Sequence, residues 1–328
     1  MSIDQGKALI ARAGEGKSYT VGVETLTLAD WPEGVPIRVA HSALNYKDAL
    51  AITGRAPIIR NFPMVLGIDL AGEVLEDSGR FKAGERVLAN GWGLSETRWG
   101  AYSQLVRMPD EIVQPLPAGF STEQAMQIGT AGYTAMLCVM ALDDHGLQPG
   151  RDAVLVTGAS GGVGSVAVSL LARRGYHVIA VSGRPEQAGF LQELGAAEVL
   201  SRDAISSGGR PMAKERWAGV VDVAGGPMLA DAIAQTRYDG IVAACGMAGG
   251  GSLATTVYPF ILRGVTLRGV DSVMVPMARR EAAWARLEAE LDRGLLARLS
   301  STRQFDELPT LGADLLDGRL HGRIAIAL

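Results

Sequence analysis

A glycine-rich turn between two apolar runs constrains this chain most. The aliphatic run 154–156 leads into Thr157-Gly158-Ala159-Ser160-Gly161-Gly162-Val163-Gly164. An apolar helical pattern follows at 166–171, and a second strand-like run at 178–181. The order strand, glycine turn, helix, strand is the one that builds a dinucleotide-binding site.

The spacing of the glycines alone is a weak signal, because Ala159 stands where the first glycine of a G-x-G-x-x-G motif belongs. The context discriminates, since the turn follows a predicted strand and opens a predicted helix. Gly161 is expected to let the backbone approach a pyrophosphate, and Gly164 to let the helix pack closely on the sheet. Free N–H groups at the helix start would bind the phosphates. The alternative is an ordinary glycine-rich βα turn.

The end of the second strand predicts which dinucleotide binds. NAD sites place Asp or Glu there to accept from the ribose 2′-hydroxyl, whereas this chain has Ser182-Gly183-Arg184 and no carboxylate in 178–184. Arg184 can pair with a 2′-phosphate through its planar fork of donors. Arg202, after the third predicted strand, can add a second charge. Either arginine can instead be a solvated side chain, but the pattern favours NADPH over NADH.

The first 120 residues predict a barrel-like all-β unit. Short strand-like runs separated by Gly and Pro alternate there with little helix. We expect strands at 7–15, 19–28, 37–40, 67–74, 85–88 and 102–106.

The pattern changes near residue 120. Ser121 and Gln124 match a capping box, which predicts a helix over 122–142. Alternating strands and helices then imply a parallel sheet, with strands near 153–157, 177–181, 197–200, 219–223 and 240–244 and helices near 163–174, 186–194 and 227–236. We therefore expect an α/β protein with a catalytic domain at 1–120, a nucleotide-binding domain at 121–262, and a tail at 263–328 that returns to the first domain.

Composition argues against several other classes. A net charge of −4 over 328 residues does not suit a nucleic-acid-binding protein. The two cysteines, Cys138 and Cys245, lie in apolar runs and read as core thiols of a reducing compartment. The longest apolar segment, 125–142, is interrupted by polar residues and glycine, so we expect a buried helix rather than a membrane span. With no signal-peptide pattern at 1–5, the expected location is the cytoplasm.

The β-rich domain lacks the ligands of a catalytic zinc site. Residues 1–120 contain no Cys and only His41, which we expect to be structural. Polarisation of the substrate must then come from side chains or backbone donors. The best candidates lie in Asn45-Tyr46-Lys47-Asp48, at a strand-to-helix junction. The Tyr46 hydroxyl either donates a proton or only positions the cofactor.

Three further charged residues allow two interpretations each. Lys47 and Asp48 either take part in catalysis or pair with each other. Arg60, in a loop, either meets an anionic substrate or is solvated.

Long stretches of the chain carry a resemblance to a known family. They are SALNYKDALAITG at 42–54, IIRNFPMVLGIDLAGEV at 58–74, GTAGYTAMLCVMAL at 129–142, VTGASGGVGSVAV at 156–168, AVSGR at 180–184, and the region 242–273. The chain resembles the zinc-free medium-chain dehydrogenase/reductase superfamily and, within it, the acrylyl-CoA reductase family, long labelled quinone oxidoreductases. Zinc-dependent relatives have a Cys in the region of Tyr46 and a His in the 67–69 stretch, and this chain has neither. Segments 203–217 and 292–312 match no motif of the family.

The resemblance implies a GroES-like β-barrel catalytic domain, a Rossmann domain and a homodimer. It implies NADPH-dependent reduction of the conjugated double bond of acrylyl-CoA to propionyl-CoA, with no metal. Within the polar cluster 45–48, the candidate catalytic residues are Tyr46, Asn45 and Asp48. The implied NADPH contacts are Tyr46, Ser160, Gly161, Gly162, Val163, Gly164, Ser182, Gly183, Arg184, Arg202, Gly246 and Ser272.

Two other functions stay open at the level of sequence. One is an NADPH:quinone oxidoreductase, which differs in accepting a flat ring instead of a CoA thioester. Arginines placed for the CoA phosphates would favour the thioester, and Arg60, Arg263 and Arg268 are the candidates. The other is a catalytically silent NADPH-binding protein, which the intact Tyr46 cluster disfavours.

Overall fold

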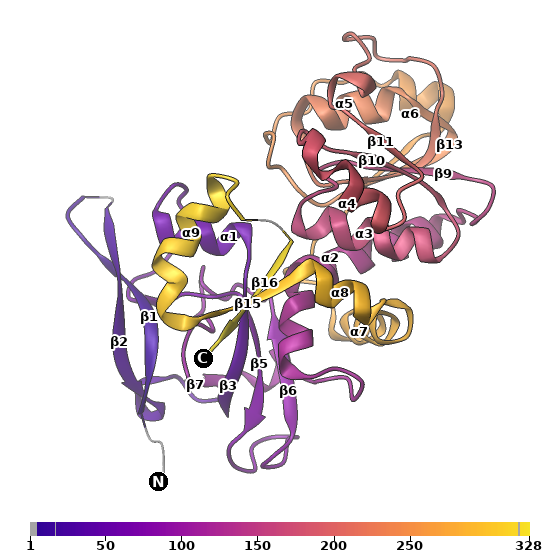
Figure 1. Cartoon of the computed structure of the whole chain (residues 1–328). Coiled ribbons are helices and arrows are strands. Elements are labelled where there is room, and N and C mark those ends of the chain that lie inside the picture. The colour runs from indigo at the N-terminus through magenta and orange to yellow at the C-terminus, as the bar shows by residue number, and fades with distance from the viewer. Residues whose placement is uncertain (1–4, 17, 321) are drawn as a thin grey trace. The chain divides into compact units, whose positions relative to one another are not determined.

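The computed structural model describes residues 5–16, 18–320 and 322–328 and divides into two compact units (Figure 1). Unit 1 comprises Met1–Thr130, Val273–Glu288 and Leu296–Leu328, and unit 2 comprises Ala131–Ser272 and Ala289–Leu295.

Unit 1 is built mainly on antiparallel strands. One sheet has the strand order β15-β16-β3-β5-β6-β8 with β7 also paired to β3, and a three-stranded sheet has the order β2-β1-β4. The strands are β1 (Gln5–Ala13), β2 (Tyr19–Thr27), β3 (Val35–Leu44), β4 (Met64–Val65), β5 (Asp69–Val74), β6 (Arg86–Asn90), β7 (Leu105–Met108), β8 (Gln114–Pro115), β15 (Ser300–Gln304) and β16 (Arg323–Ala327). Two apolar clusters fill the space inside these sheets, and their members come from both.

The C-terminal strand lies beside an early strand of the chain. Figure 1 shows the yellow β16 next to the purple β3, and the two pair antiparallel with Ile324 opposite Leu44. The helices of unit 1 are α1 (Tyr46–Thr53) and α9 (Leu308–Leu316). They pack so closely that a Cβ on Gly312 would lie 3.0 Å from Ile52 Cγ2.

Three more helices contain a boundary between the units or adjoin one. They are α2 (Thr122–His145), α7 (Met277–Glu290) and α8 (Arg293–Leu299). Single 3-10 turns complete the chain at η1 (Leu28–Asp30), η2 (Asp110–Ile112), η3 (Pro185–Gln187), η4 (Asp203–Ile205) and η5 (Phe305–Glu307).

Unit 2 is the predicted doubly wound parallel sheet. Its six strands have the order β11-β10-β9-β12-β13-β14, and every pairing is parallel. The strands are β9 (Ala153–Val156), β10 (His177–Val181), β11 (Glu198–Leu200), β12 (Trp217–Asp222), β13 (Thr236–Ala244) and β14 (Thr266–Gly269), and the helices are α3 (Gly162–Arg173), α4 (Ala188–Glu193), α5 (Gly226–Ala234) and α6 (Tyr258–Arg263). The strand order reverses between β9 and β12, and ligands of such sheets bind at the carboxyl ends of the strands at this switch point.

The helix predicted over 122–142 exists, but its prediction as one continuous helix was wrong. Gly129 has φ 51° and ψ −162°, which interrupts the helical backbone inside α2. A Cβ on Gly129 would lie 2.7 Å from Arg323 Nη2 and 2.9 Å from Asp69 Oδ2. Only glycine can adopt this positive φ and also leave room for the side chains of Arg323 and Asp69.

Helix α2 is also the one helix in the described ranges that is long and apolar enough to cross a membrane. Of its most apolar 18-residue window, 89% is buried within the protein. That burial accounts for its composition, as expected for a core helix.

The part of the chain after residue 292 forms more regular structure than its sequence pattern indicated. Region 292–312 showed no recognised motif, yet it forms α8, β15 and the start of α9. Helix α6 was missed as well. The two short apolar runs near 265–270 form a single strand, β14.

The break at Gly129 generates a stability prediction. Gly129→Ala should lower the free energy of unfolding by at least about 2 kcal/mol, because the side chain meets both a disfavoured backbone and the buried Asp69–Arg323 region. Gly22→Ala is the matched control, since a Cβ at Gly22 meets nothing within 4 Å. Urea unfolding followed by tryptophan fluorescence measures both, and equal stabilities of the two variants would contradict the account.

Candidate active site

The glycine turn of unit 2 has the geometry of an anion-binding helix start. Helix α3 begins at Gly162, with Gly161 as its N-cap. The first N–H groups of a helix have no partner within it and point along its axis. A Cβ at Gly164 would lie 2.4 Å from Gly158 O, so only glycine allows α3 to sit this close to the turn.

The end of β10 brings a serine pair and an arginine together. Ser160 Oγ and Ser182 Oγ are 3.1 Å apart, which joins the glycine turn to the end of β10. Ser182 Oγ also accepts from the Arg184 N–H at 3.1 Å. A Cβ on Gly183 would lie 2.6 Å from Arg202 Cζ, so the guanidinium of Arg202 lies against the glycine.

This arrangement suits a 2′-phosphate better than a 2′-hydroxyl. Strands β10 and β11 are neighbours, with Val181 opposite Leu200, so Arg184 and Arg202 both follow the carboxyl ends of adjacent strands. The segment 178–184 contains no carboxylate. A guanidinium against Gly183, with no carboxylate in this segment to accept from a ribose 2′-hydroxyl, favours an anionic ribose substituent.

Gly246 and Ser272 also lie beyond the carboxyl ends of parallel strands. Gly246 follows β13, and a Cβ there would lie 2.2 Å from Val223 O in the segment after β12. Ser272 follows β14 and is half-buried. The parallel topology therefore brings all the cofactor residues predicted in unit 2 to one edge of its sheet.

In unit 1, the Asn45 side chain bridges two buried carboxylates. Its Nδ2 donates to Asp48 Oδ2 at 3.0 Å and to Asp69 Oδ2 at 2.8 Å. The Asn45 backbone N–H donates to Asp48 Oδ2 at 3.0 Å, and the Ile68 N–H donates to Asp48 Oδ1 at 3.1 Å. Asp48 and Asp69 are both fully buried. Asn45 and Asp48 thus fix the first turn of α1.

Three more residues complete this cluster. Thr130 donates to Asp69 through its N–H at 2.9 Å and its hydroxyl at 2.5 Å. Arg323 donates from Nε to Gln127 O at 2.9 Å and from Nη2 to Asn45 Oδ1 at 3.4 Å. The Tyr102 hydroxyl donates to Ala43 O at 2.9 Å. We call Asn45, Asp48, Asp69, Tyr102, Thr130 and Arg323 the buried polar cluster.

Burial shifts the acid–base equilibria of this cluster. It raises the pKa of Asp48 to about 7, with the charge of Asp69 as the second cause, while hydrogen bonds from Asn45 and Ile68 oppose the shift. Burial likewise raises the pKa of Asp69 against its hydrogen bonds from Thr130. The pKa of the Arg323 guanidinium is lowered by burial, and the charge of Asp69 counteracts that.

Tyr46 differs from its neighbours because its side chain is accessible. It is the first residue of α1 and is 53% exposed. Lys47 pairs with Glu96, at 2.5 Å from Nζ to Oε2. The alternative of a local Lys47–Asp48 pair was wrong, because successive helical side chains do not face each other. Arg60 Nε also lies near Glu96, at 3.8 Å from Oε1. The carboxylate of Glu96 is therefore shared by Lys47, the residue after Tyr46, and by Arg60.

The other arginine candidates for CoA phosphates are engaged elsewhere. Arg263 donates to three backbone carbonyls, the nearest being Ala213 O at 2.6 Å, so its guanidinium is used to hold the chain. Arg268 Nη1 lies 3.4 Å from Asp144 Oδ2. His41, expected to be structural, is half-buried with Nδ1 3.0 Å from Thr122 Oγ1.

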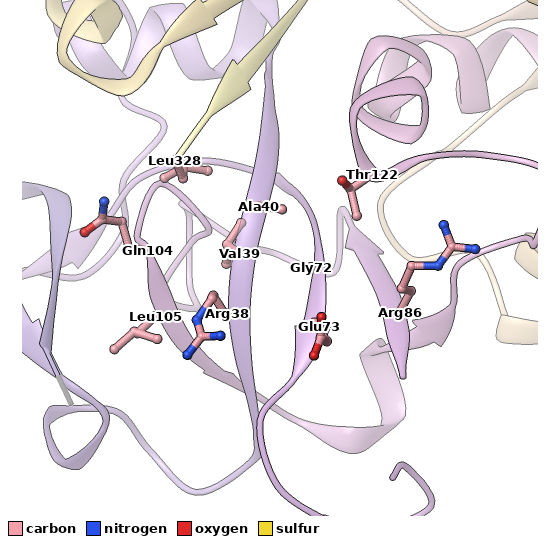
Figure 2. A pocket seen from close by; sticks show the side chains of 10 residues that line it. All are labelled: Arg38, Val39, Ala40, Gly72, Glu73, Arg86, Gln104, Leu105, Thr122 and Leu328. Carbon is pink, nitrogen blue, oxygen red and sulfur yellow. The ribbon is translucent and has the colours of Figure 1, made fainter. Parts of the chain in front are cut away.

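An open cavity of about 550 Å³ lies on unit 1, away from the predicted residues. Figure 2 shows Arg38, Glu73 and Arg86 on adjacent strands around it, with Thr122 at one side. None of the site residues predicted in the described chain lines it. Arg86 already donates to Phe120 O at 3.0 Å. With its charges alternating across the strands, this cavity does not present the concentrated positive charge that a phosphorylated ligand needs.

Asp69, Thr130 and Arg323 were missed by the sequence reasoning. A signal for Asp69 existed, since it is a carboxylate within the otherwise apolar stretch Ile68-Asp69-Leu70-Ala71. Buried carboxylates need partners, but which partners they find depends on long-range pairing. Neither Thr130 nor Arg323 carries such a signal.

The residues do not fit a zinc ion. Among the described residues, no group of three or more His, Cys, Asp or Glu side chains could hold a metal. The two carboxylates of the buried polar cluster are already bonded to Asn45, Ile68 and Thr130.

Comparison with known proteins agrees with this geometry. Residues 32–118 match the alcohol dehydrogenase GroES-like domain, and residues 162–289 match the zinc-binding dehydrogenase family. A mainly β unit of GroES type joined to a doubly wound nucleotide-binding sheet defines a medium-chain dehydrogenase/reductase, as predicted, although the predicted all-β unit also contains α1 and α9. Acrylyl-CoA reductase AcuI of Ruegeria pomeroyi is 48% identical over 97% of this chain and 98% of its own. The chain belongs to the acrylyl-CoA reductase family.

Solved structures show the same fold. The yhdH oxidoreductase of Salmonella enterica, in complex with NADP, is 48% identical and covers 98% of this chain and 99% of its own with a TM-score of 0.95. The Bacillus subtilis protein yhfP with NAD bound is 42% identical and covers 99% of both chains with a TM-score of 0.94. YhfP is named provisionally as a quinone oxidoreductase.

The raised pKa of Asp48 predicts a pH-dependent stability. A carboxyl group with a higher pKa in the folded state binds its proton more tightly there, so its contribution to stability falls as pH rises from about 4 to about 7. The Tm of Asp48→Asn minus that of the wild type should therefore increase from pH 5 to pH 8.

The difference in Tm between Asp48→Asn and the wild type is measured, rather than either Tm alone, because other groups also change the stability with pH. Burial lowers the pKa of His41, which gives both proteins a slope of the opposite sign. A difference in Tm that stays constant or decreases over this pH range would contradict the buried ionisation of Asp48.

Proposed function

We propose that the protein is an NADPH-dependent reductase that converts acrylyl-CoA to propionyl-CoA. The observation that carries this proposal is the near full-length identity of 48% to an acrylyl-CoA reductase. The carboxyl ends of β10 and β11 in unit 2 also support the proposal. Arg202 lies there against Gly183, between Ser182 and Arg184 in the chain, and its guanidinium suits the 2′-phosphate of NADPH.

The residues of unit 2 would hold the cofactor by its anionic groups. The N–H groups of Gly162, Val163 and Gly164 at the start of α3 would bind the pyrophosphate. Ser160 and Ser182 keep the turn joined to β10. Bound NADPH supplies a hydride to the β-carbon of the conjugated thioester, which leaves negative charge on the thioester oxygen and a basic α-carbon.

The residues of unit 1 would complete the reduction with a proton. Tyr46 is exposed at the start of α1 and carries a hydroxyl group. We therefore propose that this hydroxyl donates the proton to the α-carbon. The Asn45 amide and the Asp48 carboxyl are buried and bonded to one another and to Asp69. Their part in catalysis is therefore to position Tyr46 by holding the helix start.

Quinone reduction is the second candidate. It is supported by YhfP, which is 43% identical over 94% of this chain and carries a quinone oxidoreductase name. A flat acceptor would need the same hydride and the same cofactor contacts, and it would not need a site for the CoA phosphates.

We further propose a homodimer in the cytoplasm that binds neither nucleic acid nor membrane. Strand β14 pairs only with β13 among the described strands, so one edge of the sheet is open. Apolar side chains close to that edge in sequence are exposed, including Ile261 at 73% and Leu262 at 59%. A second copy could cover them while pairing its own edge strand. The net charge of −4 supports the absence of nucleic acid.

A parallel assay tests the proposed substrate. Oxidation of NADPH should be rapid with acrylyl-CoA, slower with crotonyl-CoA and slowest with a benzoquinone. The KM for NADPH should lie at least about tenfold below that for NADH, because charge-assisted pairing with the 2′-phosphate is worth about 1.5–3 kcal/mol. Reduction of the quinone alone would reject the thioester, and a preference for NADH would reject the cofactor assignment.

The role of Tyr46 has its own test. Tyr46→Phe should lower kcat by about 10²-fold while the Kd for NADPH changes little, because general acid catalysis contributes at least this much. Tyr238→Phe is the control, since Tyr238 is 72% exposed and has no proposed role. An unchanged kcat, or an effect confined to NADPH affinity, would leave Tyr46 with cofactor positioning alone.

A further inference from the structure

A hydroxyl and a carboxylate form a buried pair at the carboxyl ends of two neighbouring strands in unit 2. Thr157 is the first residue after β9, Asp222 is the last residue of β12, and both are fully buried. The Thr157 hydroxyl donates to Asp222 Oδ1 at 2.6 Å. Burial raises the pKa of Asp222, and the hydrogen bond from Thr157 opposes that shift. The pair therefore joins β9 to β12 at the point where the strand order reverses.

The same two side chains hold the backbone that follows β12. Thr157 Oγ1 accepts from the Val223 N–H at 3.0 Å and from the Ala224 N–H at 3.3 Å. Asp222 Oδ2 accepts from the Gly225 N–H at 2.8 Å. We call Val223, Ala224 and Gly225 the β12 turn. A threonine hydroxyl has one donor and two acceptor positions, so all the hydrogen-bonding capacity of Thr157 serves Asp222 and this turn.

The segment after β13 packs directly on the β12 turn. The Gly249 N–H donates to Ala224 O at 2.7 Å. A Cβ on Gly246 would lie 2.2 Å from Val223 O, which leaves no room for a side chain between the two backbones. Gly246 is one of the predicted NADPH contacts. Because backbone meets backbone at both points, a displacement of the β12 turn displaces Gly246 as well.

The strand order assigns the two halves of a bound dinucleotide to different strands. Strands β10 and β11 lie on one side of β9, whereas β12 and β13 lie on the other. Arg184 and Arg202 follow β10 and β11, so the adenosine half with its 2′-phosphate would lie over those strands. A dinucleotide bound across the switch point then extends its nicotinamide half over the ends of β12 and β13, where the β12 turn and Gly246 lie.

We propose that Thr157 and Asp222 are positioning residues for the nicotinamide half of NADPH, and that they act through the β12 turn and Gly246. Their hydrogen bonds fix the backbone that receives this half, whereas the adenosine half depends on the ends of β10 and β11. The inference rests on the NADPH binding of the proposed function and is independent of the acceptor that is reduced.

Calorimetric titration with two ligands tests the positioning role. Thr157→Val removes the hydroxyl at nearly constant side-chain volume and leaves Asp222 Oδ1 and two N–H groups without their partner. The Kd for NADPH should rise at least about fivefold, the lower end of typical coupling between positions. The Kd for adenosine 2′,5′-bisphosphate, which carries the 2′-phosphate but no nicotinamide, should stay unchanged. Thr157→Ser keeps the hydroxyl and should restore the wild-type Kd for NADPH.

Thr236→Val is the matched control for a general loss of stability. Thr236 is fully buried at the start of β13, the end remote from Gly246, and its hydroxyl donates to Ala232 O at 2.8 Å. This variant should lower the Tm while the Kd for NADPH, measured well below that Tm, stays unchanged. Asp222→Asn is the second variant and should weaken NADPH binding selectively, which decides the question even when Thr157→Val does not fold.

The outcomes separate the positioning role from the proposed function. An equal loss of affinity for both ligands, an unchanged Kd for NADPH in the folded variants of Thr157 and Asp222, or a failure of Thr157→Ser to restore binding would overturn the positioning role. Selective loss of NADPH binding, combined with a wild type that does not reduce acrylyl-CoA, would support the positioning role and reject the proposed acceptor.

Discussion

The bridge from Asn45 to Asp48 and Asp69 is the interaction on which unit 1 depends. It joins the start of α1, strand β5 and, through Thr130 and Arg323, the break in α2 and strand β16. Leaving a buried polar group without its hydrogen-bond partner usually costs about 1–3 kcal/mol, and more for a charged group, since the group keeps its desolvation penalty. Segments distant in the chain are therefore held together by one polar cluster inside an apolar unit.

This cluster also explains how the candidate site in unit 1 is organised. Asn45 and Asp48 order the backbone immediately before and after Tyr46, while the Tyr46 side chain stays exposed. A helix start that is held by buried hydrogen bonds can present the Tyr46 hydroxyl in a defined orientation, which general acid catalysis requires. In unit 2, the candidate site is positioned instead by close approaches at Gly164 and Gly183 that leave no room for a side chain. The parallel strands also bring its residues to the same end of the sheet.

Local patterns predicted most of the fold. The strand–turn–helix at the glycine turn and five of the six strands of the parallel sheet follow from periodicity and turn chemistry. The break at Gly129 could not be predicted, because its cause is the approach of Asp69 and Arg323 from other segments. Helix α9 and strand β15 were missed because tertiary packing, rather than a motif, stabilises such short elements.

The candidate site was predictable to a different extent in each unit. In unit 2, the glycine turn, the end of the second strand and the family resemblance pointed to residues that the parallel sheet gathers at the carboxyl ends of its strands. In unit 1, the sequence pointed to Asn45, Tyr46 and Asp48 but could not show that two of them are buried and one is exposed. That division of roles depends on Asp69, Thr130 and Arg323, whose contacts with the cluster arise only on folding.

Isotope transfer tests the central claim most directly. The enzyme would be given acrylyl-CoA with NADPH deuterated at C4, or with unlabelled NADPH in deuterium oxide, and the propionyl-CoA analysed by mass spectrometry and NMR. The account predicts deuterium from the cofactor at the β-carbon and deuterium from the solvent at the α-carbon. Cofactor deuterium at the α-carbon, or NADPH oxidation that yields no propionyl-CoA, would contradict it.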